Sequence, residues 1–149
     1  MINKTLSILF LLLLPTQLGK HFFFDFSYLS GVRVDYLAPT VYLIDIIVFL
    51  FAIVNLKIVF KFFKNKKVLI SLFLLLINVL FSRLPTISFY WFIKIIGFLI
   101  VVSLAKKIIV TLKEKLILIT LLLSGLFELI LSIIQLVNKH SVQGIFYYF

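Results

Sequence analysis

A chain of 149 residues in which 64% are hydrophobic and only 13% are charged is too apolar for an ordinary soluble domain, which has about 45–50% apolar and about 25% charged residues. Its mean hydropathy of +1.27 predicts an integral membrane protein, because a globule of this size cannot bury so much apolar surface. The net charge of +10 does not indicate nucleic-acid binding, since no basic patch alternates with stacking aromatic residues. The absence of cysteine excludes disulfides, thiolate metal sites and a cysteine nucleophile.

Five apolar stretches come close to the roughly 18 residues that a helix needs to cross the hydrocarbon layer of a bilayer. The predicted spans are 2–18, 41–60, 68–85, 87–105 and 116–137. They leave an external loop at 19–40 and cytoplasmic loops at 61–67 and 106–115. The predicted fold class is therefore an all-α membrane protein, with about five transmembrane helices in a single transmembrane region. The first span also fits a cleaved signal peptide, although the following PTQLGK lacks a cleavage site of small residues.

Lysines between the spans set the predicted orientation. Five lie at or after the end of the second span and four after the fourth: Lys57, Lys61, Lys64, Lys66, Lys67, Lys106, Lys107, Lys113 and Lys115. Short loops rich in lysine stay on the cytoplasmic side, and these two junctions are an even number of spans apart. We therefore expect the N-terminus inside, Phe149 outside and the segment 19–40 on the outer face.

Three charged residues lie more than three positions from either end of the predicted spans, namely Asp45, Lys94 and Glu128. Each costs at least about 2–3 kcal/mol near the bilayer centre, so each is expected to face protein or water. Helical side chains lean toward the N-terminus of their helix, so Asp45 and Lys94 lean outward and can meet near the interface. Two interpretations stay open: a structural ion pair with snorkelling side chains, or the lining of an outward-facing polar cavity. The aromatic residues Tyr42 and 89–91 are predicted to form an interfacial belt.

The sequence contains no motif of a metalloprotease, a serine hydrolase, a P-loop or a dinucleotide-binding fold. The two histidines, His21 and His140, have no neighbour at metal-ligand spacing, so no metal is expected. His21 could form an acid–base pair with Asp25 or Asp35, but a single loop histidine is more often a surface residue. The residues themselves therefore predict no catalytic centre and no cofactor.

The external segment has the most distinctive sequence in the chain. Pro15–Phe22 reads PTQLGKHF and Gly31–Thr40 reads GVRVDYLAPT. The chain thereby resembles the N-terminal region of bacterial O-antigen ligases and O-antigen polymerases, in which a first span runs into the former turn and a Gly-x-Arg-x-Asp-Tyr-x-x-Pro-Thr stretch opens the second span. The segments SRLPTISFYWFIK, at Ser82–Lys94, and SVQGIFYYF, at Ser141–Phe149, are also similar to such proteins.

The resemblance implies a metal-independent membrane glycosyltransferase with a GT-C-like fold of about a dozen spans. Such enzymes transfer or polymerise glycans carried on undecaprenyl pyrophosphate, at the outer face of the bacterial inner membrane. The catalytic residues of the family lie in later spans and in a large external loop that this sequence does not match, so none is carried over. The chain is then expected to be the N-terminal part of such an enzyme, inactive by itself. An alternative is a small complete membrane protein that acts as an accessory or transporter subunit, which the intramembrane charges suit as well.

A lipid that carries a pyrophosphate favours cations near the outer interface, and Arg33, Arg83 and Lys94 are available there. These three are the candidate substrate-binding residues, although loop or snorkelling roles stay open for each. The expected partners are membrane lipids and an undecaprenyl-pyrophosphate-linked glycan.

Overall fold

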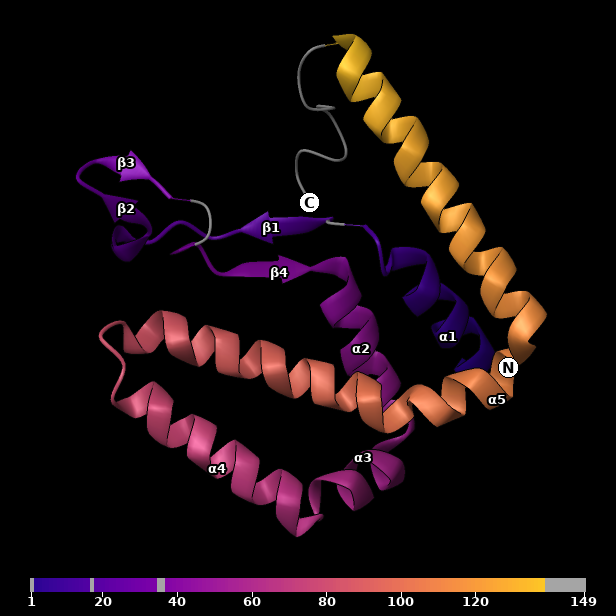
Figure 1. Ribbon diagram of the computed structural model, residues 1–149, viewed down its shortest axis with the longest axis horizontal. Helices are drawn as coiled ribbons and strands as arrows, with labels where there is room; N and C mark the ends of the chain where they lie inside the picture. Colours follow the sequence, from indigo (N-terminus) through magenta and orange to yellow (C-terminus); the bar gives the residue numbers. More distant parts are fainter. Residues whose placement is uncertain (1, 17, 35–36, 139–149) are drawn as a thin grey trace. The chain divides into compact units, whose positions relative to one another are not determined.

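The computed structural model describes residues 2–16, 18–34 and 37–138 and is mostly helical (Figure 1). Its described part contains five α-helices: α1 (Ile2–Leu13), α2 (Leu43–Val54), α3 (Leu56–Phe63), α4 (Lys66–Leu80) and α5 (Pro85–Asn138). Between α1 and α2 lie short strands and a 3-10 helix: β1 (Gly19–His21), η1 (Asp25–Ser27), β2 (Tyr28–Leu29), β3 (Val32–Arg33) and β4 (Thr40–Tyr42). The predicted helical class is confirmed, with the correction that the segment before α2 forms strands.

One helix of the described chain is long and apolar enough to cross a membrane, the stretch Pro85–Val137 of α5. Only 11% of its most apolar window is buried, whereas a core helix of a soluble protein is mostly buried. A second candidate arises if α2 and α3 count as one span, although the chain bends by 93° between them. The five separate spans predicted from hydropathy are not seen in the part of the chain that the structure describes.

Single residues shorten or break the first two predicted spans, 2–18 and 41–60. Helix α1 already ends at Leu13, because the residue that precedes a proline, here Pro15, is disfavoured in the helical conformation. The second stretch begins as strand β4 and is then interrupted at Asn55, whose φ of −121° and ψ of 31° are not helical. A new helix, α3, starts directly after Asn55, whose side chain makes no capping hydrogen bond.

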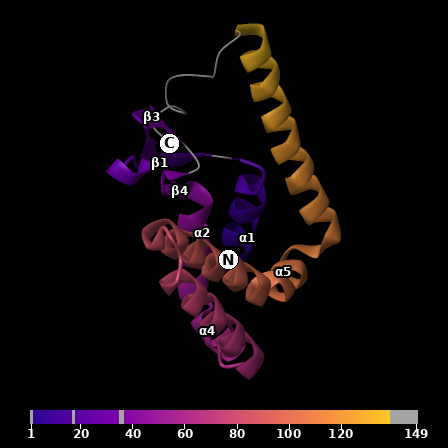
Figure 2. The same cartoon turned by 60° about the vertical axis from the view of Figure 1, so that its left-hand side comes forward.

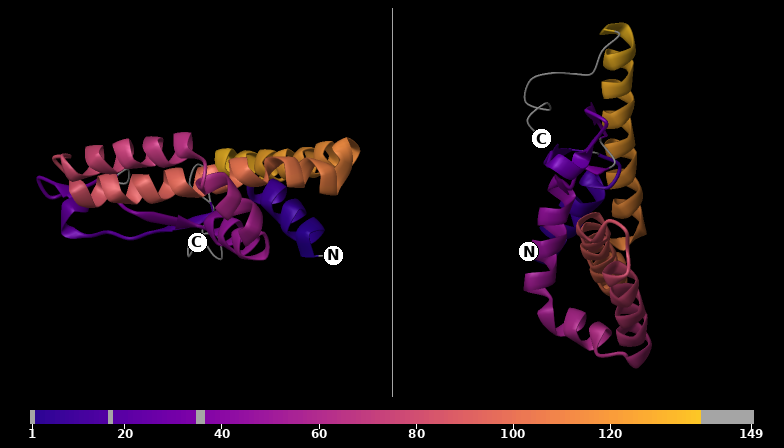
Figure 3. Two further views of the ribbon diagram at one scale, coloured as in Figure 1. Left: turned by 90° about the horizontal axis from the view of Figure 1, so that it is seen from below. Right: turned by 90° about the vertical axis from the view of Figure 1, so that its left-hand side faces the viewer.

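The third predicted span, 68–85, corresponds to α4, which ends at Leu80. Pro85 is the first residue of α5, a position that suits proline because the first helical N–H has no partner within the helix. The predicted span is therefore too long at its end. The chain turns between these two helices, and α4 runs antiparallel to the first part of α5 (Figures 1 and 3).

The predicted fourth and fifth spans, 87–105 and 116–137, lie in the single element α5, and the predicted loop 106–115 between them is helical apart from Lys113. The sequence of this loop, KKIIVTLKEK, contains no glycine or proline and several good helix formers, so its charges alone do not end the helix. Lys113 has a φ of 58° and a ψ of 152°. A positive φ is uncommon for a residue other than glycine, and here it divides α5 into two helical stretches.

The described residues divide into two compact units. The first consists of Met1–Lys20, Val41–Phe51 and Lys106–Phe149, and the second of His21–Thr40 and Ala52–Ala105. In the first unit, α1 lies beside the C-terminal rod of α5 (Figures 1 and 2), and the Ser124 hydroxyl donates to the Leu12 carbonyl. Ser7, Thr120 and Ser124 are buried. Small residues let helix backbones approach closely in membranes, so these three account for the close packing within this unit.

The second unit contains a tight hairpin and a pair of packed helices. Strands β2 and β3 pair antiparallel, with Tyr28 opposite Arg33 and Leu29 opposite Val32. Ser30 and Gly31 connect them with φ angles of 51° and 80°, the two positive values that a two-residue hairpin turn matching the strand twist requires. Helix α3 packs against α4 in the same unit.

Candidate functional site

One hydrogen bond joins the polar segment, residues 19–40, to α5 within the second unit. His21 ends β1 and Thr40 begins β4, and these two strands pair with each other. The Thr40 hydroxyl lies 2.8 Å from His21 Nδ1 and 3.1 Å from the Ala38 carbonyl oxygen. The Tyr90 hydroxyl donates to the Thr40 carbonyl at 3.0 Å. Residues that lie fifty positions apart in the sequence therefore meet at one place.

The Thr40 hydroxyl contacts both the His21 ring and a backbone carbonyl. A threonine hydroxyl has one hydrogen, and since the Ala38 carbonyl can only accept, Thr40 donates to it. Whether His21 Nδ1 donates to the Thr40 oxygen or accepts from it depends on the tautomer of the imidazole. The ring is exposed and stacks on Phe23 with 6.0 Å between ring centres. The Thr40 contact therefore holds the exposed His21 ring in place.

Backbone and side-chain hydrogen bonds inside the segment hold His21 and Thr40 in place. The Phe22 amide donates to the Pro39 carbonyl at 2.9 Å, directly beside the two site residues. Ser27 is fully buried, and its hydroxyl accepts from the Phe24 amide at 3.3 Å. Because a buried amide is costly to leave without a partner, Ser27 stabilises the folded form of the segment.

Lys94, a predicted substrate-binding residue, lies at this cluster. Its ammonium nitrogen is 5.4 Å from the centre of the Tyr90 ring, the ring whose hydroxyl binds Thr40. Residues four positions apart are neighbours on one helix face, and the lysine leans toward the N-terminus of α5 as helical side chains do. The Trp91 ring packs edge-on against Tyr90, with 5.3 Å between ring centres. A cation, a phenol and an indole therefore lie together in the first turns of α5.

The two predicted arginines lie elsewhere in the second unit. Arg33 belongs to β3, and its side chain is outside what the structure describes. Arg83 is exposed in the turn between α4 and α5, and it makes no hydrogen bond, ion pair or ring contact within the described residues. Lys94 lies about 14 Å along the helix from Pro85, so Arg83 is not part of its cluster.

The other two predicted intramembrane residues, Asp45 and Glu128, lie in the first unit. The Tyr42 amide donates to Asp45 Oδ2 at 2.8 Å, so this carboxylate caps α2, where the helix dipole also favours a negative charge. Glu128 is half-buried in α5, with no hydrogen-bond or ion-pair partner among the residues that the structure describes. The predicted pairing of Asp45 with Lys94 stays a prediction.

In the cluster formed by His21, Thr40, Tyr90 and Lys94, the Lys94 ammonium is the group whose charge suits an anion. No group of three or more histidines, cysteines, aspartates or glutamates that could hold a metal ion occurs in the described residues. Thr40 and the Tyr90 hydroxyl are absent from the sequence-based candidates, although the spacing of Tyr90 and Lys94 on one helix face could have suggested that pair. Comparisons with known protein families, with curated proteins and with solved structures find no match to this chain.

Proposed function

We propose that this chain acts at the outer face of the bacterial inner membrane, as part of a multi-pass protein related to O-antigen ligases and polymerases. In this proposal, the cluster of His21, Thr40, Tyr90 and Lys94 binds the pyrophosphate of an undecaprenyl-pyrophosphate-linked glycan. The sequences of 15–22 and 31–40 support the family relationship. The observation that carries the proposed site is the contact of the polar segment with Tyr90, whose ring lies under the Lys94 ammonium.

The position of Lys94 suits a ligand whose charge lies at the membrane surface and whose chain lies in the membrane. A lysine near a helix end directs its ammonium toward the interface while its methylene groups stay in apolar surroundings. Here the ammonium lies over Tyr90, one turn closer to the start of α5. Lysine acts on phosphate as a point charge, and hydrogen bonds to charged groups are the stronger ones, worth about 1.5–3 kcal/mol.

The exposed apolar side chains near the cluster suit the polyprenyl part of such a ligand. Phe89 and Trp91 are 50% and 52% exposed on α5, on either side of Tyr90 in the sequence. Aromatic side chains of this kind are enriched at membrane interfaces. In this proposal, Lys94 and the polar segment bind the pyrophosphate, while the surface of α5 contacts the isoprenoid chain.

Trp91 provides a direct test, because it is the single tryptophan of the chain and contacts Tyr90. The full chain in nanodiscs of phosphatidylcholine is titrated with undecaprenyl pyrophosphate, and Trp91 fluorescence is recorded. We expect a saturable change in emission with undecaprenyl pyrophosphate, and none with undecaprenol, which has the same chain without phosphate. An equal response to both lipids, or no response to either, would contradict the proposed function.

A further inference from the structure

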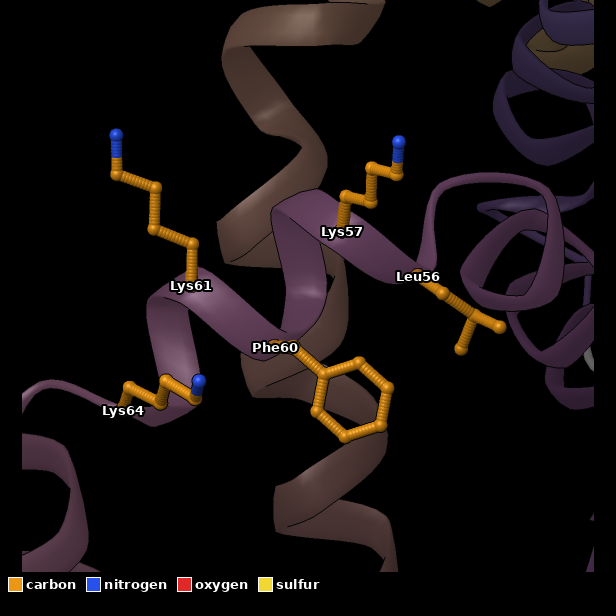
Figure 4. A pocket seen from close by; sticks show the side chains of 5 residues that line it. All are labelled: Leu56, Lys57, Phe60, Lys61 and Lys64. Atoms are coloured by element: carbon orange, nitrogen blue, oxygen red, sulfur yellow. The ribbon is translucent and has the colours of Figure 1, made fainter.

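A second charged surface lies on α3, away from the cluster in the sequence. Lys57, Lys61 and Lys64 recur at a spacing of four and three residues, which places them on one face of the helix. Figure 4 shows Lys57 and Lys61 extending to one side of α3 while Phe60 extends to the other. The remaining residues of Leu56–Phe63 are apolar. A helix with a narrow lysine face and a wide apolar arc has the composition of helices that lie in the plane of a membrane surface.

Among the described residues, no acidic side chain pairs with the lysines of α3. No acidic residue occurs between Asp45 and Glu114 in the sequence. The side chains of the three lysines make no ion pair or hydrogen bond within the described residues. Helix α4, which packs against α3, carries two further lysines and no acidic residue in its first turn. The N-terminus of α4 carries a partial positive charge, which adds to the charge of these lysines. An anion is therefore favoured beside α3.

The surface is hollowed and has an apolar part. The three lysines, together with Leu56 and Phe60, line an open pocket of about 630 Å³. Leu56 and Phe60 are 46% and 61% exposed, so about half of their apolar area is left uncovered by the described residues. A free phosphate or an acidic peptide would use the lysines but would gain little from two exposed apolar side chains. A phospholipid offers both parts, an anionic headgroup and a hydrocarbon chain.

The backbone around α3 is consistent with a position at the membrane surface. The chain bends by 93° between α2 and α3, at the N-cap residue Asn55. A helix that follows a bend of this size does not continue the direction of the apolar helix before it. At eight residues, α3 is about 12 Å long, too short to cross the hydrocarbon layer by itself.

We propose that α3 is an interfacial helix that binds the headgroup of an anionic phospholipid through Lys57, Lys61 and Lys64, with Leu56 and Phe60 against its glycerol and acyl groups. This site is separate from the proposed pyrophosphate cluster and does not depend on it. Each lysine near an anionic membrane surface contributes roughly a fivefold preference for it. Three lysines on one face therefore predict a clear selection of anionic over zwitterionic lipid at this helix.

The test uses the full chain with a fluorescent reporter on α3. Phe60→Trp in a Trp91→Phe background gives a single tryptophan in the pocket, since Trp91 is the only natural one. The protein is reconstituted in nanodiscs that contain equal mole fractions of either brominated phosphatidylglycerol or brominated phosphatidylcholine, both of which quench tryptophan at close range. We expect at least a roughly fivefold stronger apparent affinity for the anionic lipid, and a loss of most of this preference in 0.5 M NaCl, because exposed charges are screened by salt.

The triple variant Lys57→Gln, Lys61→Gln and Lys64→Gln is expected to quench equally with both lipids. The matched control, Lys106→Gln, Lys107→Gln and Lys115→Gln, removes the same charge from the other lysine-rich segment and is expected to keep the preference. Equal quenching by both lipids in the parent chain would overturn the proposal and indicate that something other than lipid covers the surface. So would a preference that survives both the triple substitution and high salt. The salt measurement needs no lysine substitution, so it stays decisive if the triple variant fails to fold.

Discussion

Replacing Lys94 by glutamine is expected to weaken binding of undecaprenyl pyrophosphate, measured through Trp91 fluorescence, by about tenfold or more. Glutamine keeps a polar side chain of similar length but removes the charge. The loss of a hydrogen bond between charged groups corresponds to about 1.5–3 kcal/mol, a factor of roughly 10–100 in affinity. The contact of the ammonium with the Tyr90 ring is lost as well, so the orientation of the remaining side chains is expected to loosen.

Two variants separate a role in binding from a role in folding. Lys94→Arg keeps the positive charge and is expected to restore most of the affinity, although arginine presents a planar group instead of a point charge. Lys106→Gln makes the same chemical change outside the cluster and is expected to leave the affinity unchanged. If Lys94→Gln leaves the affinity for undecaprenyl pyrophosphate unaltered, or if Lys106→Gln lowers it equally, Lys94 is not part of the binding site. The unfolding transition of each variant shows whether the protein is intact.

Replacing Ser124 by leucine is expected to destabilise the packing of α1 against α5 by roughly 2–4 kcal/mol. Ser124 is 2% exposed, so a larger side chain has to displace its neighbours. Its hydroxyl also donates to the carbonyl of Leu12, which belongs to the last turn of α1, where carbonyls lack a partner within the helix. The measurement is the midpoint of reversible unfolding in mixed micelles as the mole fraction of SDS is raised.

The control is Ser132→Leu on the same helix, where the serine is exposed and a larger apolar side chain meets no packed neighbour. Its unfolding midpoint is expected to stay close to that of the parent chain. Ser124→Ala removes the hydroxyl without adding volume and is expected to cost about 0.5–1.5 kcal/mol, the usual net value of one hydrogen bond. If Ser124→Leu and Ser132→Leu unfold at the same midpoint, α1 does not pack on α5 through Ser124.

Hydropathy predicts the helical character of the chain well and its helix boundaries poorly. The residues on the two sides of Asn55 are similarly apolar, so hydropathy predicts one span there. The backbone instead forms two helices with a sharp bend between them. At Lys113 the error is the opposite one, because a break between two helices is predicted where the chain is almost continuously helical. The charges of 106–115 predict a loop, but helix propensity is high there, and a single residue of unusual φ replaces the expected loop.

The candidate site could be predicted only in part, because its decisive contacts are distant in the sequence. Lys94 was expected near the outer interface from its place in an apolar stretch. Its neighbour Tyr90 is four positions away on the same helix face, which is a pattern that the sequence displays. The bond from Tyr90 to Thr40 spans fifty positions, and no local pattern encodes it. Asp45 lies in the first turn of α2, and its bond to the Tyr42 amide gives it a capping role that hydropathy could not reveal.

Photo-crosslinking with a lipid-linked glycan tests the proposed site most directly. A diazirine-bearing undecaprenyl pyrophosphate disaccharide is added to right-side-out membrane vesicles that contain the full chain, and the adducts are located by mass spectrometry after illumination. We predict adducts within 21–40 and 85–105, and their loss when unlabelled undecaprenyl pyrophosphate competes. Adducts confined to α3, or adducts that undecaprenol displaces equally well, would contradict a pyrophosphate site formed by His21, Thr40, Tyr90 and Lys94.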